Sequence, residues 1–397
     1  MRIERALLTT ILLANPLGAA AQTDTVVARG LSRGVVYRQF VDKTGPFIVH
    51  LVRVNLREPS VELRAVRAHD ELRTRERTTE MVRRLQSTGA SVLVAVNADF
   101  FNLQTGENES NQVIAGEWWK GVKNTDSPYD TYDNAHVQFA LDARRRPLID
   151  RFLFDGRAWA RGTMTPIITL NFNQPGNPEG VVLYTSRFGA MTPRDTTRVT
   201  AEASMVQVGR KSDTLLFVRR GAVRDSSGSA IPAGGAVLSA YGAGSRLKEV
   251  HAMADGDTVK ILLATIPRLS PSSSPTLVIG GWPRILRNGE NVVAEAPVQE
   301  GTISRNAEAR HPRTAIGFSR DSSTLYLLVV DGRQEASVGM TLTELATLMR
   351  RLGAWNAMNF DGGGSTTMVV DGIVVNKPSD NTGEREIASA LAVVKRP

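Results

Sequence analysis

Cysteine is absent from this chain of 397 residues. Its absence excludes disulfide bonds, a thiol nucleophile and metal sites built on cysteine ligands. Histidine is scarce, with five residues, and no spacing among them fits a metal-binding motif, so we expect the histidines to be structural. The candidates for catalytic and substrate-binding groups are therefore carboxylates, arginines and glycine-rich loops.

Long apolar runs are missing from residue 22 onward, so no membrane span is expected. The first 21 residues differ from the rest: Arg2 and Arg5 precede an apolar run, and small residues lead up to Ala21. This order is typical of a secretory signal peptide and is too short for a membrane span. We therefore predict a signal peptide at residues 1–21 and a secreted or periplasmic protein. An exported chain without disulfides favours a bacterial periplasm or exterior.

Acidic residues are outnumbered, since 48 Lys and Arg stand against 40 Asp and Glu and give a net charge of +8. A basic surplus favours an anionic partner. We expect no nucleic-acid binding, because the chain lacks a basic-aromatic motif and carries an export signal. A sugar-phosphate or anionic glycan is the substrate class that fits the expected compartment. A solvated basic surface without a dedicated partner is an equally good interpretation of the charge.

Helical periodicity is also scarce, while short apolar runs between turn residues recur along the chain. We therefore predict an α+β (mixed α/β) fold with large mixed, partly antiparallel sheets and few helices. Residues 22–80 are predicted to be an N-terminal β-rich segment. Residues 81–397 are predicted to form one domain with a β-rich insertion at about 135–265.

A helix, a short strand and a glycine-rich loop follow one another near the C-terminus. Thr341 and Glu344 have the spacing of a capping box, and apolar residues then recur at helical spacing up to Gly353. Residues 354–360 are predicted to be a buried strand, and Asp361 follows at its end, ahead of three glycines. Glycine N–H groups can form an anion-binding nest beside such a carboxylate. The pattern favours a ligand site, although an Asp-Gly pair also opens ordinary turns.

A second strand end carries a similar polar pattern. A helix predicted near residues 78–89 precedes a strand predicted at residues 91–96, and Asn97 and Asp99 follow that strand. The unit that ends at Asp361 has the same order of helix, glycine, strand and Asn-x-Asp. Two such strand ends would bring polar side chains to one edge of a sheet, where the ligand sites of α/β proteins lie.

Several short motifs occur in a fixed order between residues 91 and 394. They are the segments 96–101, 279–289, 313–317, 330–333, 339–346, 359–365 and 383–385. Each motif alone is weak, but in this order they resemble the phosphodiester glycosidase family. Two positions depart from the family pattern: Trp282 stands where another glycine is usual, and Ala98 and Asp99 replace a more usual small pair. Both departures would reshape the sugar subsite.

The resemblance implies hydrolysis of the bond between an α-linked sugar, classically N-acetylglucosamine, and a phosphodiester. Bacterial members are often described only as exopolysaccharide-related, so we expect a cell-surface or exopolysaccharide glycan and leave the sugar and its aglycone open. Two other interpretations stay open. One is a metal-dependent phosphodiesterase acting on a glycan-phosphate, and the other is a non-catalytic polysaccharide-binding or assembly protein.

Asp361 is the predicted catalytic carboxylate, acting on an oxocarbenium-like centre as nucleophile or as base for water. Arg313 is predicted to clamp the phosphate, because a planar guanidinium matches two phosphate oxygens. Backbone amides and hydroxyls complete the predicted anion site, from Gly362, Gly363, Gly364, Ser365 and Thr366.

Further side chains are candidates for a second carboxylate or for contacts with the substrate. Asp331 and Glu384 are predicted to be catalytic, and the remaining substrate-binding candidates are Asn97, Asp99, Arg333 and Arg385. Asp331 has a structural alternative as part of a turn, and Arg313 and Arg385 could simply pair with buried carboxylates. No cofactor is predicted. A calcium or magnesium ion on clustered aspartates is an open alternative, although no EF-hand order is present.

Overall fold

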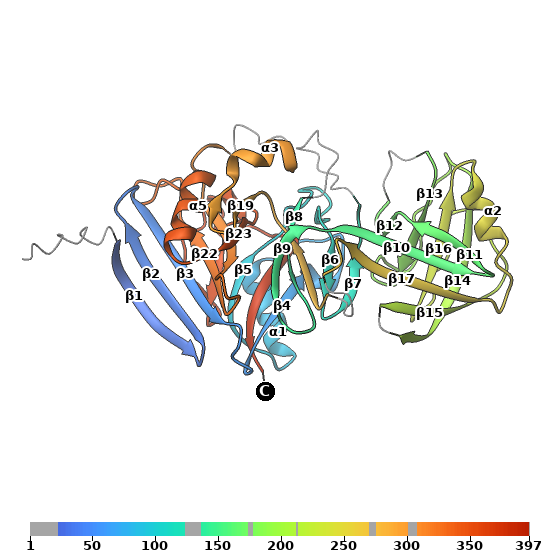
Figure 1. Ribbon diagram of the computed structural model, residues 1–397, viewed down its shortest axis with the longest axis horizontal. Helices are drawn as coiled ribbons and strands as arrows, with labels where there is room; N and C mark the ends of the chain where they lie inside the picture. The colour runs from blue at the N-terminus through green and yellow to red at the C-terminus, as the bar shows by residue number, and fades with distance from the viewer. Residues whose placement is uncertain are drawn as a thin grey trace, which may run out of the picture.

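The structure of the protein is a computed structural model that describes residues 23–123, 136–173, 178–211, 213–269, 275–300 and 308–396. The predicted signal peptide at residues 1–21 lies outside these ranges. Two lobes lie along the long axis of the molecule (Figure 1). The larger lobe holds both ends of the described chain, and the smaller lobe is made of strands between residues 153 and 266.

The larger lobe is built around an eight-stranded sheet in which all neighbouring strands are antiparallel. In spatial order its strands are β1 (Thr23–Ser32), β2 (Val35–Asp42), β3 (Phe47–Asn55), β22 (Thr324–Val330), β21 (Arg313–Phe318), β23 (Asn356–Asn359), β19 (Arg284–Arg287) and β20 (Glu290–Asn291). Helix α5 (Leu342–Arg351) packs on this sheet, because its apolar residues recur at helical spacing. Leu345 and Met349 share a hydrophobic cluster with Leu328 of β22 and Ala357 of β23.

Two five-stranded sheets complete the larger lobe. One contains, in spatial order, β25 (Ile373–Val374), β24 (Met368–Val370), β5 (Ser91–Asn97), β26 (Ser389–Lys395) and β4 (Val61–Arg67). The other contains β7 (Glu117–Lys120), β6 (Gln112–Ile114), β18 (Leu277–Gly280), β8 (Val137–Leu141) and β9 (Pro147–Arg151). The three sheets meet in one core, where Val52, Val94 and Phe139 belong to a single hydrophobic cluster. Helix α1 (Thr78–Ser87) packs against β5 and β26 through Met81 and Val82.

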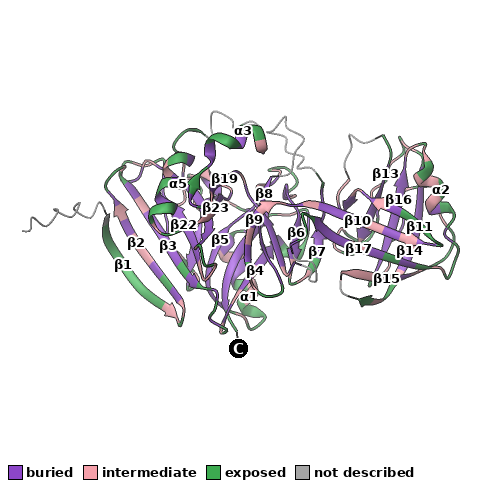
Figure 2. Cartoon of the chain, viewed as in Figure 1, coloured by how far each residue is buried: buried purple, intermediate pink, exposed green. Residues whose placement is uncertain are grey.

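The smaller lobe has an eight-stranded sheet and a hydrophobic core of its own. Its strands are, in spatial order, β11 (Thr163–Ile167), β10 (Leu153–Ala160), β17 (Thr258–Ile266), β15 (Thr214–Arg219), β14 (Thr200–Lys211), β16 (Gly235–Tyr241), β13 (Gly180–Thr185) and β12 (Thr169–Leu170). Helix α2 (Ser245–His251) packs against this sheet. Phe154, Phe217 and Ile261 fill the core, and the inner strands of the lobe are correspondingly buried along most of their length (Figure 2).

Short helical segments connect the remaining elements. They are η1 (Ala68–Asp70), η2 (Val293–Glu295), α3 (Ala296–Gln299) and η3 (Gly363–Ser365). The prediction of large, partly antiparallel sheets with few helices is confirmed. The protein is more sheet-rich than the α+β or mixed α/β class that we expected, because most neighbouring strands pair antiparallel and need no helical crossover. The predicted boundaries at residues 22–80, 81–397 and about 135–265 stay predictions. None of the described helices is long and apolar enough to cross a membrane.

Replacing Leu345 by Ala should lower the free energy of unfolding by about 2–5 kcal/mol, because a fully buried leucine on α5 would leave a cavity against the large sheet. Thr347 lies on the exposed face of the same helix, so Thr347→Ala is the matched control and should be nearly neutral. Urea unfolding measures both changes. An equal, small effect of the two substitutions would contradict the packing described for α5.

Candidate active site

Asn97, at the end of β5, joins the two strand ends that carry the polar motifs. Its side-chain Nδ2 donates a hydrogen bond of 2.6 Å to the carbonyl oxygen of Asp361, and its Oδ1 accepts from the Thr314 hydroxyl at 2.6 Å. The same Oδ1 accepts from the backbone N–H of Thr367 at 3.1 Å. The backbone N–H of Asp361 donates to Ala98 at 2.8 Å. The ends of β5 and β23, from two different sheets, are therefore fixed side by side, with Asn97 fully buried between them.

Two arginines lie directly against the glycines that follow Asp361. A methyl group on Gly364 would come within 2.1 Å of Arg385 Nη2 and 2.2 Å of Asp380 Oδ1. A methyl group on Gly363 would lie 3.0 Å from Arg333 Nη2, and Gly363 also has a φ of +60°, which favours glycine. A side chain at position 364 would therefore displace the ends of Arg385 and Asp380 from the loop, and the backbone conformation favours glycine at position 363.

A third arginine lies beside the first glycine of the loop. A methyl group on Gly362 would be 3.8 Å from Arg313 Cδ. Arg313 is buried at the start of β21, where its Nε donates to the carbonyl of Met340 and its Nη2 to the carbonyl of Ala309, both at 2.9 Å. Burial and the neighbouring Arg333 lower the pKa of Arg313 to about 10, so the guanidinium keeps its charge at neutral pH.

The other two guanidinium groups are held by polar contacts at the surface. Arg385 pairs with Asp380 through two hydrogen bonds, of 2.8 and 3.1 Å. Arg333 is exposed; its Nη1 donates to the Ser379 hydroxyl at 3.3 Å, and its Nη2 lies 3.3 Å from His311 Nδ1. Three guanidinium groups thus lie around the glycine loop, together with the carboxylates of Asp361 and Asp380.

Asp361 keeps some solvent contact, but the surrounding protein removes most of the water from its carboxylate. This desolvation raises its pKa to about 6, against the opposing effects of a hydrogen bond from Ser365 and the charge of Arg385. The backbone N–H of Gly362 also donates to Asp361 Oδ1, at 2.8 Å. At neutral pH the group is mostly ionised and retains a measurable basicity, as nucleophilic and general-base carboxylates require.

Ser365 and Thr366 end the glycine loop and are both buried. The Ser365 hydroxyl bonds to Asp361 and lies 3.5 Å from Arg385 Nη1. The buried Thr366 hydroxyl has no hydrogen-bond partner among the residues that the structure describes.

Asp99 lies close enough to Asp361 that its negative charge contributes to the raised pKa of Asp361. Its own carboxylate is buried and accepts hydrogen bonds from Asn108 Nδ2 at 3.0 Å and from the Ser110 N–H and hydroxyl at 3.1 and 3.2 Å. Burial raises the pKa of Asp99 despite these bonds. The structure thus brings Asp99 to the site and ties it to the segment that carries Asn108 and Ser110.

Asp331 and Glu384 make their observed contacts with the scaffold. Asp331 is buried, accepts from the backbone N–H of Lys377 at 3.0 Å and lies 3.5 Å from His50 Nε2. Glu384 accepts from the N–H and hydroxyl of Thr79, at 2.9 and 2.7 Å, in the first turn of α1. A carboxylate there satisfies free backbone donors and interacts favourably with the helix dipole. These two residues therefore fix segments on either side of the loop.

Sequence reasoning missed an aromatic wall near Asp99. Trp282 stacks on His136, with ring centroids 5.7 Å apart and planes inclined by 30°, and meets Phe100 edge-on at 6.1 Å. His136 is buried, and its Nδ1 lies 3.8 Å from Glu109 Oε2. No spacing in the sequence links residues 100, 136 and 282. The Trp282 departure from the family pattern was the one available signal.

A second missed feature is a buried charged cluster behind Asp99. Lys120 is fully buried, lies 3.3 Å from Glu107 and donates to the carbonyl oxygen of Asn108. Arg67, also fully buried, donates to Asn108 Oδ1 at 3.0 Å. This cluster holds the segment that positions Asp99. Three or more His, Asp or Glu residues do not converge as metal ligands anywhere in the described ranges.

Replacing Gly364 by Ala should destabilise the protein by about 1 kcal/mol, because the new methyl group displaces the partly exposed Arg385–Asp380 pair from the loop. Gly30, on the open edge strand β1, has no atom within 4 Å of the corresponding position, so Gly30→Ala is the matched control. Urea unfolding compares the two variants. Equal stability of both would contradict the close approach of Arg385 to the loop.

Comparison with known proteins places these features in a family. Residues 198–394 match the family model described as phosphodiester glycosidase. The mouse N-acetylglucosamine-1-phosphodiester alpha-N-acetylglucosaminidase is 28% identical over 242 residues, which cover 57% of this chain and 43% of the mouse protein. The bovine protein of the same name is 28% identical over 302 residues, which cover 67% of this chain and 54% of the relative. The chain thus spans about half the length of these curated relatives.

A solved structure extends the likeness over nearly the whole fold. The crystal structure of a hypothetical protein from Synechocystis superposes with a TM-score of 0.70, covers 95% of this chain and 64% of that protein, and is 20% identical in sequence. This likeness concerns the fold alone. The family match over residues 198–394 includes the glycine loop, Arg313, Arg333 and Arg385. Through residues 198–394 the chain belongs to the phosphodiester glycosidase family, which confirms the resemblance drawn from its motifs.

Proposed function

We propose that the protein is an exported hydrolase that cleaves the bond between an α-linked sugar and a phosphodiester in a cell-surface or exopolysaccharide glycan. Membership in the phosphodiester glycosidase family supports the reaction class. The printed name of the mouse and bovine relatives suggests N-acetylglucosamine as the sugar, at 28% identity. The observation that carries the proposal is a desolvated carboxylate, Asp361, next to a glycine loop faced by three arginines.

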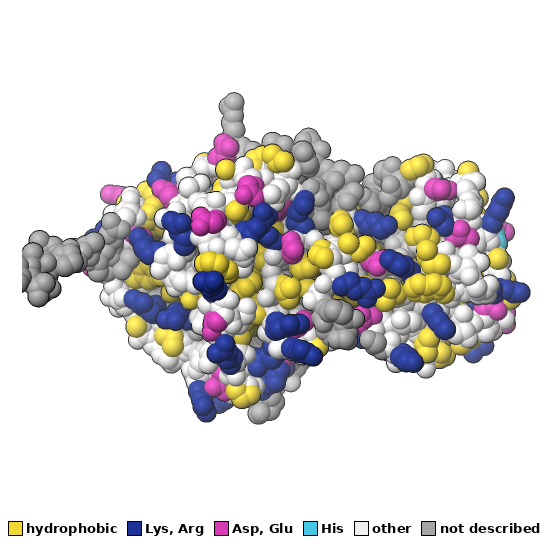
Figure 3. Space-filling view, viewed as in Figure 1, with side chains coloured by type: hydrophobic (Ala, Val, Ile, Leu, Met, Phe, Trp, Pro, Cys, Tyr) yellow, Lys and Arg dark blue, Asp and Glu magenta, His cyan; other side chains and the backbone are white. Residues whose placement is uncertain are grey.

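The local charge of the loop suits a phosphodiester. Arg313, Arg333 and Arg385 all approach the glycine loop, and Arg385 pairs there with Asp380 through two hydrogen bonds. Lys and Arg side chains are otherwise spread over the drawn face of both lobes instead of forming one patch (Figure 3). The overall basic charge is therefore mostly a solvated surface, and the local arginine cluster is the feature that supports an anionic substrate.

In the proposed chemistry, one set of groups stabilises the charge of the leaving phosphodiester and Asp361 acts on the sugar carbon. A glycosyl phosphodiester already has a good leaving group, because the departing phosphate is a weak base. Guanidinium groups and loop amides would hold its charge as the glycosidic C–O bond breaks. Asp361 would stabilise the oxocarbenium-like centre, as nucleophile or as base for the attacking water. A strongly acidic proton donor is not needed for this leaving group.

The remaining predicted site residues take positioning roles in this proposal. Asn97 fixes the backbone of Asp361, and Asp99 fixes the segment around Ser110 beside the aromatic wall. Glu384 anchors the segment before Arg385 to α1, and Asp331 holds the backbone at Lys377. Each of these carboxylates or amides already has protein partners. They can orient the groups that touch substrate without meeting it themselves.

Asp361→Asn should lower kcat by about 10³-fold or more on methyl-phosphate α-N-acetylglucosaminide, because the amide removes the reacting carboxylate. Arg313→Ala should cost about 10²–10³-fold, as the loss of a charge-stabilising donor does. Release of free sugar measures both. Asp371→Asn, at the exposed turn between β24 and β25, is the matched control and should keep full activity.

The same assay also tests the metal-dependent alternative. Activity that persists in EDTA and is lost in Asp361→Asn supports the proposal. Activity abolished by EDTA, or unchanged in Asp361→Asn, contradicts it and favours a metal-dependent phosphodiesterase. A well-folded protein without turnover on several α-glycosyl phosphates favours a non-catalytic glycan-binding role.

The acid limb of kcat/KM against pH should lie near pH 6, because Asp361 must be ionised and its pKa is raised to about 6. An ordinary aspartate would place this limb near pH 4. Arg385→Gln should move the limb to higher pH, since the charge of Arg385 lowers the pKa of Asp361. Arg350→Gln, on the exposed face of α5, changes the net charge equally and should leave the limb in place. A limb near pH 4 would contradict the assignment of Asp361.

A further inference from the structure

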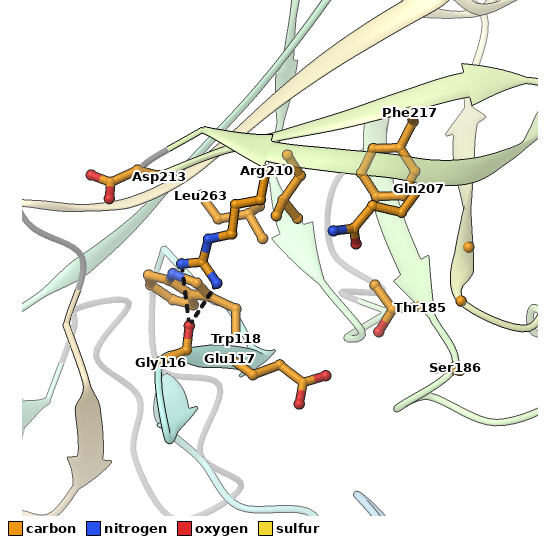
Figure 4. Close-up of a pocket in the computed structure, with 13 residues that line it drawn as sticks. Gly116, Glu117, Trp118, Thr185, Ser186, Gln207, Arg210, Asp213, Phe217 and Leu263 are labelled. Atoms are coloured by element: carbon orange, nitrogen blue, oxygen red, sulfur yellow. Dashed lines mark hydrogen bonds between the residues drawn. The ribbon is translucent and has the colours of Figure 1, made fainter.

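A cavity of about 300 Å³ lies between the smaller lobe and the turn that joins β6 to β7 (Figure 4). It is lined from the larger lobe by Gly116, Glu117 and Trp118. Residues of β14 and β15, including Gln207 and Phe217, line it from the smaller lobe. Asp361 and the glycine loop do not line it, so the cavity is separate from the candidate active site.

The lining of the cavity has two chemically different parts. Trp118 and Phe217 are buried aromatic residues that give it an apolar wall. Gln207 and Arg210, both exposed, and the half-exposed Thr185 present an amide, a guanidinium and a hydroxyl around the opening. A pyranose ring has the same division, with an apolar C–H face and a rim of hydroxyls. The volume is at the small end of ligand pockets, which suits a single ring.

One polar atom of the lining lacks a partner. Trp118 is buried, and its indole N–H has no hydrogen-bond partner among the residues that the structure describes. Figure 4 shows this indole beside the guanidinium of Arg210. Arg210 itself donates to the carbonyl of Gly116 at 3.5 Å through both terminal nitrogens, which is a weak contact. The indole nitrogen itself is buried, so a ligand oxygen at this end of the cavity would accept from the guanidinium of Arg210.

The opening of the cavity is held in shape by charged contacts. Arg187, just beyond β13, makes hydrogen bonds of 2.8 and 2.6 Å to both carboxylate oxygens of Glu117. The same guanidinium lies over the ring of Trp119, 4.2 Å from its centroid. On the other side, Asp213 lies 3.6 Å from Arg268. The contacts of Arg187 join the two lobes at the opening, so a ligand would meet a preformed site and bind without ordering it first.

We propose that this cavity is an accessory carbohydrate-binding site that takes one sugar ring of a glycan. The ring would lie against Trp118 and Phe217, with its hydroxyls toward Gln207 and Thr185. Arg210 adds a donor for a ring hydroxyl, and the carboxylates of Glu117 and Asp213 also line the cavity, so the site favours a neutral sugar over an acidic one. The site goes beyond the proposed hydrolysis: it would hold a glycan chain on the smaller lobe whether or not the catalytic loop acts on that chain.

The test is direct binding of three methyl glycosides, of N-acetylglucosamine, glucose and glucuronic acid, to the full-length protein. None carries a phosphodiester, so hydrolysis does not interfere. Saturation-transfer NMR and calorimetry should detect binding of at least one sugar, with a dissociation constant on the order of millimolar. The double variant Gln207→Ala, Arg210→Ala should weaken it at least tenfold. Both side chains are exposed, so the variant should fold normally.

Two controls separate this site from the catalytic loop. Val208 is exposed, lies next to Gln207 on β14 and does not line the cavity, so Val208→Ala should bind the sugars as wild type does. Arg385→Gln, at the catalytic loop, should also leave this binding unchanged. Failure of every sugar to bind overturns the proposal. So does binding that survives the double variant, or binding that only Arg385→Gln removes.

Discussion

The candidate site depends on the close approach of arginine side chains to a backbone without side chains of its own. At Gly364 a single methyl group would overlap both Arg385 and Asp380, and at Gly363 it would crowd Arg333. Charged groups can therefore lie against the loop that follows Asp361, where any other residue would push them away. The absence of side chains concentrates positive charge in the space beside the carboxylate, and this charge is what a phosphodiester requires.

The position of the glycine loop is fixed because the side-chain amide of Asn97, at the end of β5, ties the loop to strands from two sheets. Asn97 uses both atoms of its side-chain amide, bonding to Asp361, Thr314 and Thr367. Thr314 belongs to β21, and Asp361 and Thr367 lie at the two ends of the glycine loop, so the two sheets cannot move apart at this point without breaking buried hydrogen bonds. Burial of the same region withdraws water from the Asp361 carboxylate and raises its pKa. Rigid placement and the raised basicity therefore have one structural cause.

Local patterns in the sequence predicted much of this arrangement. The capping box at Thr341 and Glu344 is present at the start of α5, and the strand before Asp361 forms as expected. Motif order identified the family and the glycine loop. What the sequence could not show were contacts between distant segments, because no periodicity links a carboxylate to a partner hundreds of residues away. The bonds from Thr79 to Glu384 are such a case, and they suggest a positioning role where a catalytic one was predicted.

In the proposed reaction, Asp361 acts at the anomeric carbon and not at phosphorus. Hydrolysis of methyl-phosphate α-N-acetylglucosaminide in ¹⁸O-labelled water tests this directly, with the position of the label read by mass spectrometry. Cleavage of the glycosidic C–O bond predicts the label in the released sugar, at the anomeric hydroxyl, and unlabelled methyl phosphate. Label in the phosphate-containing product, with an unlabelled sugar, would contradict the account and assign the protein to phosphodiesterase chemistry.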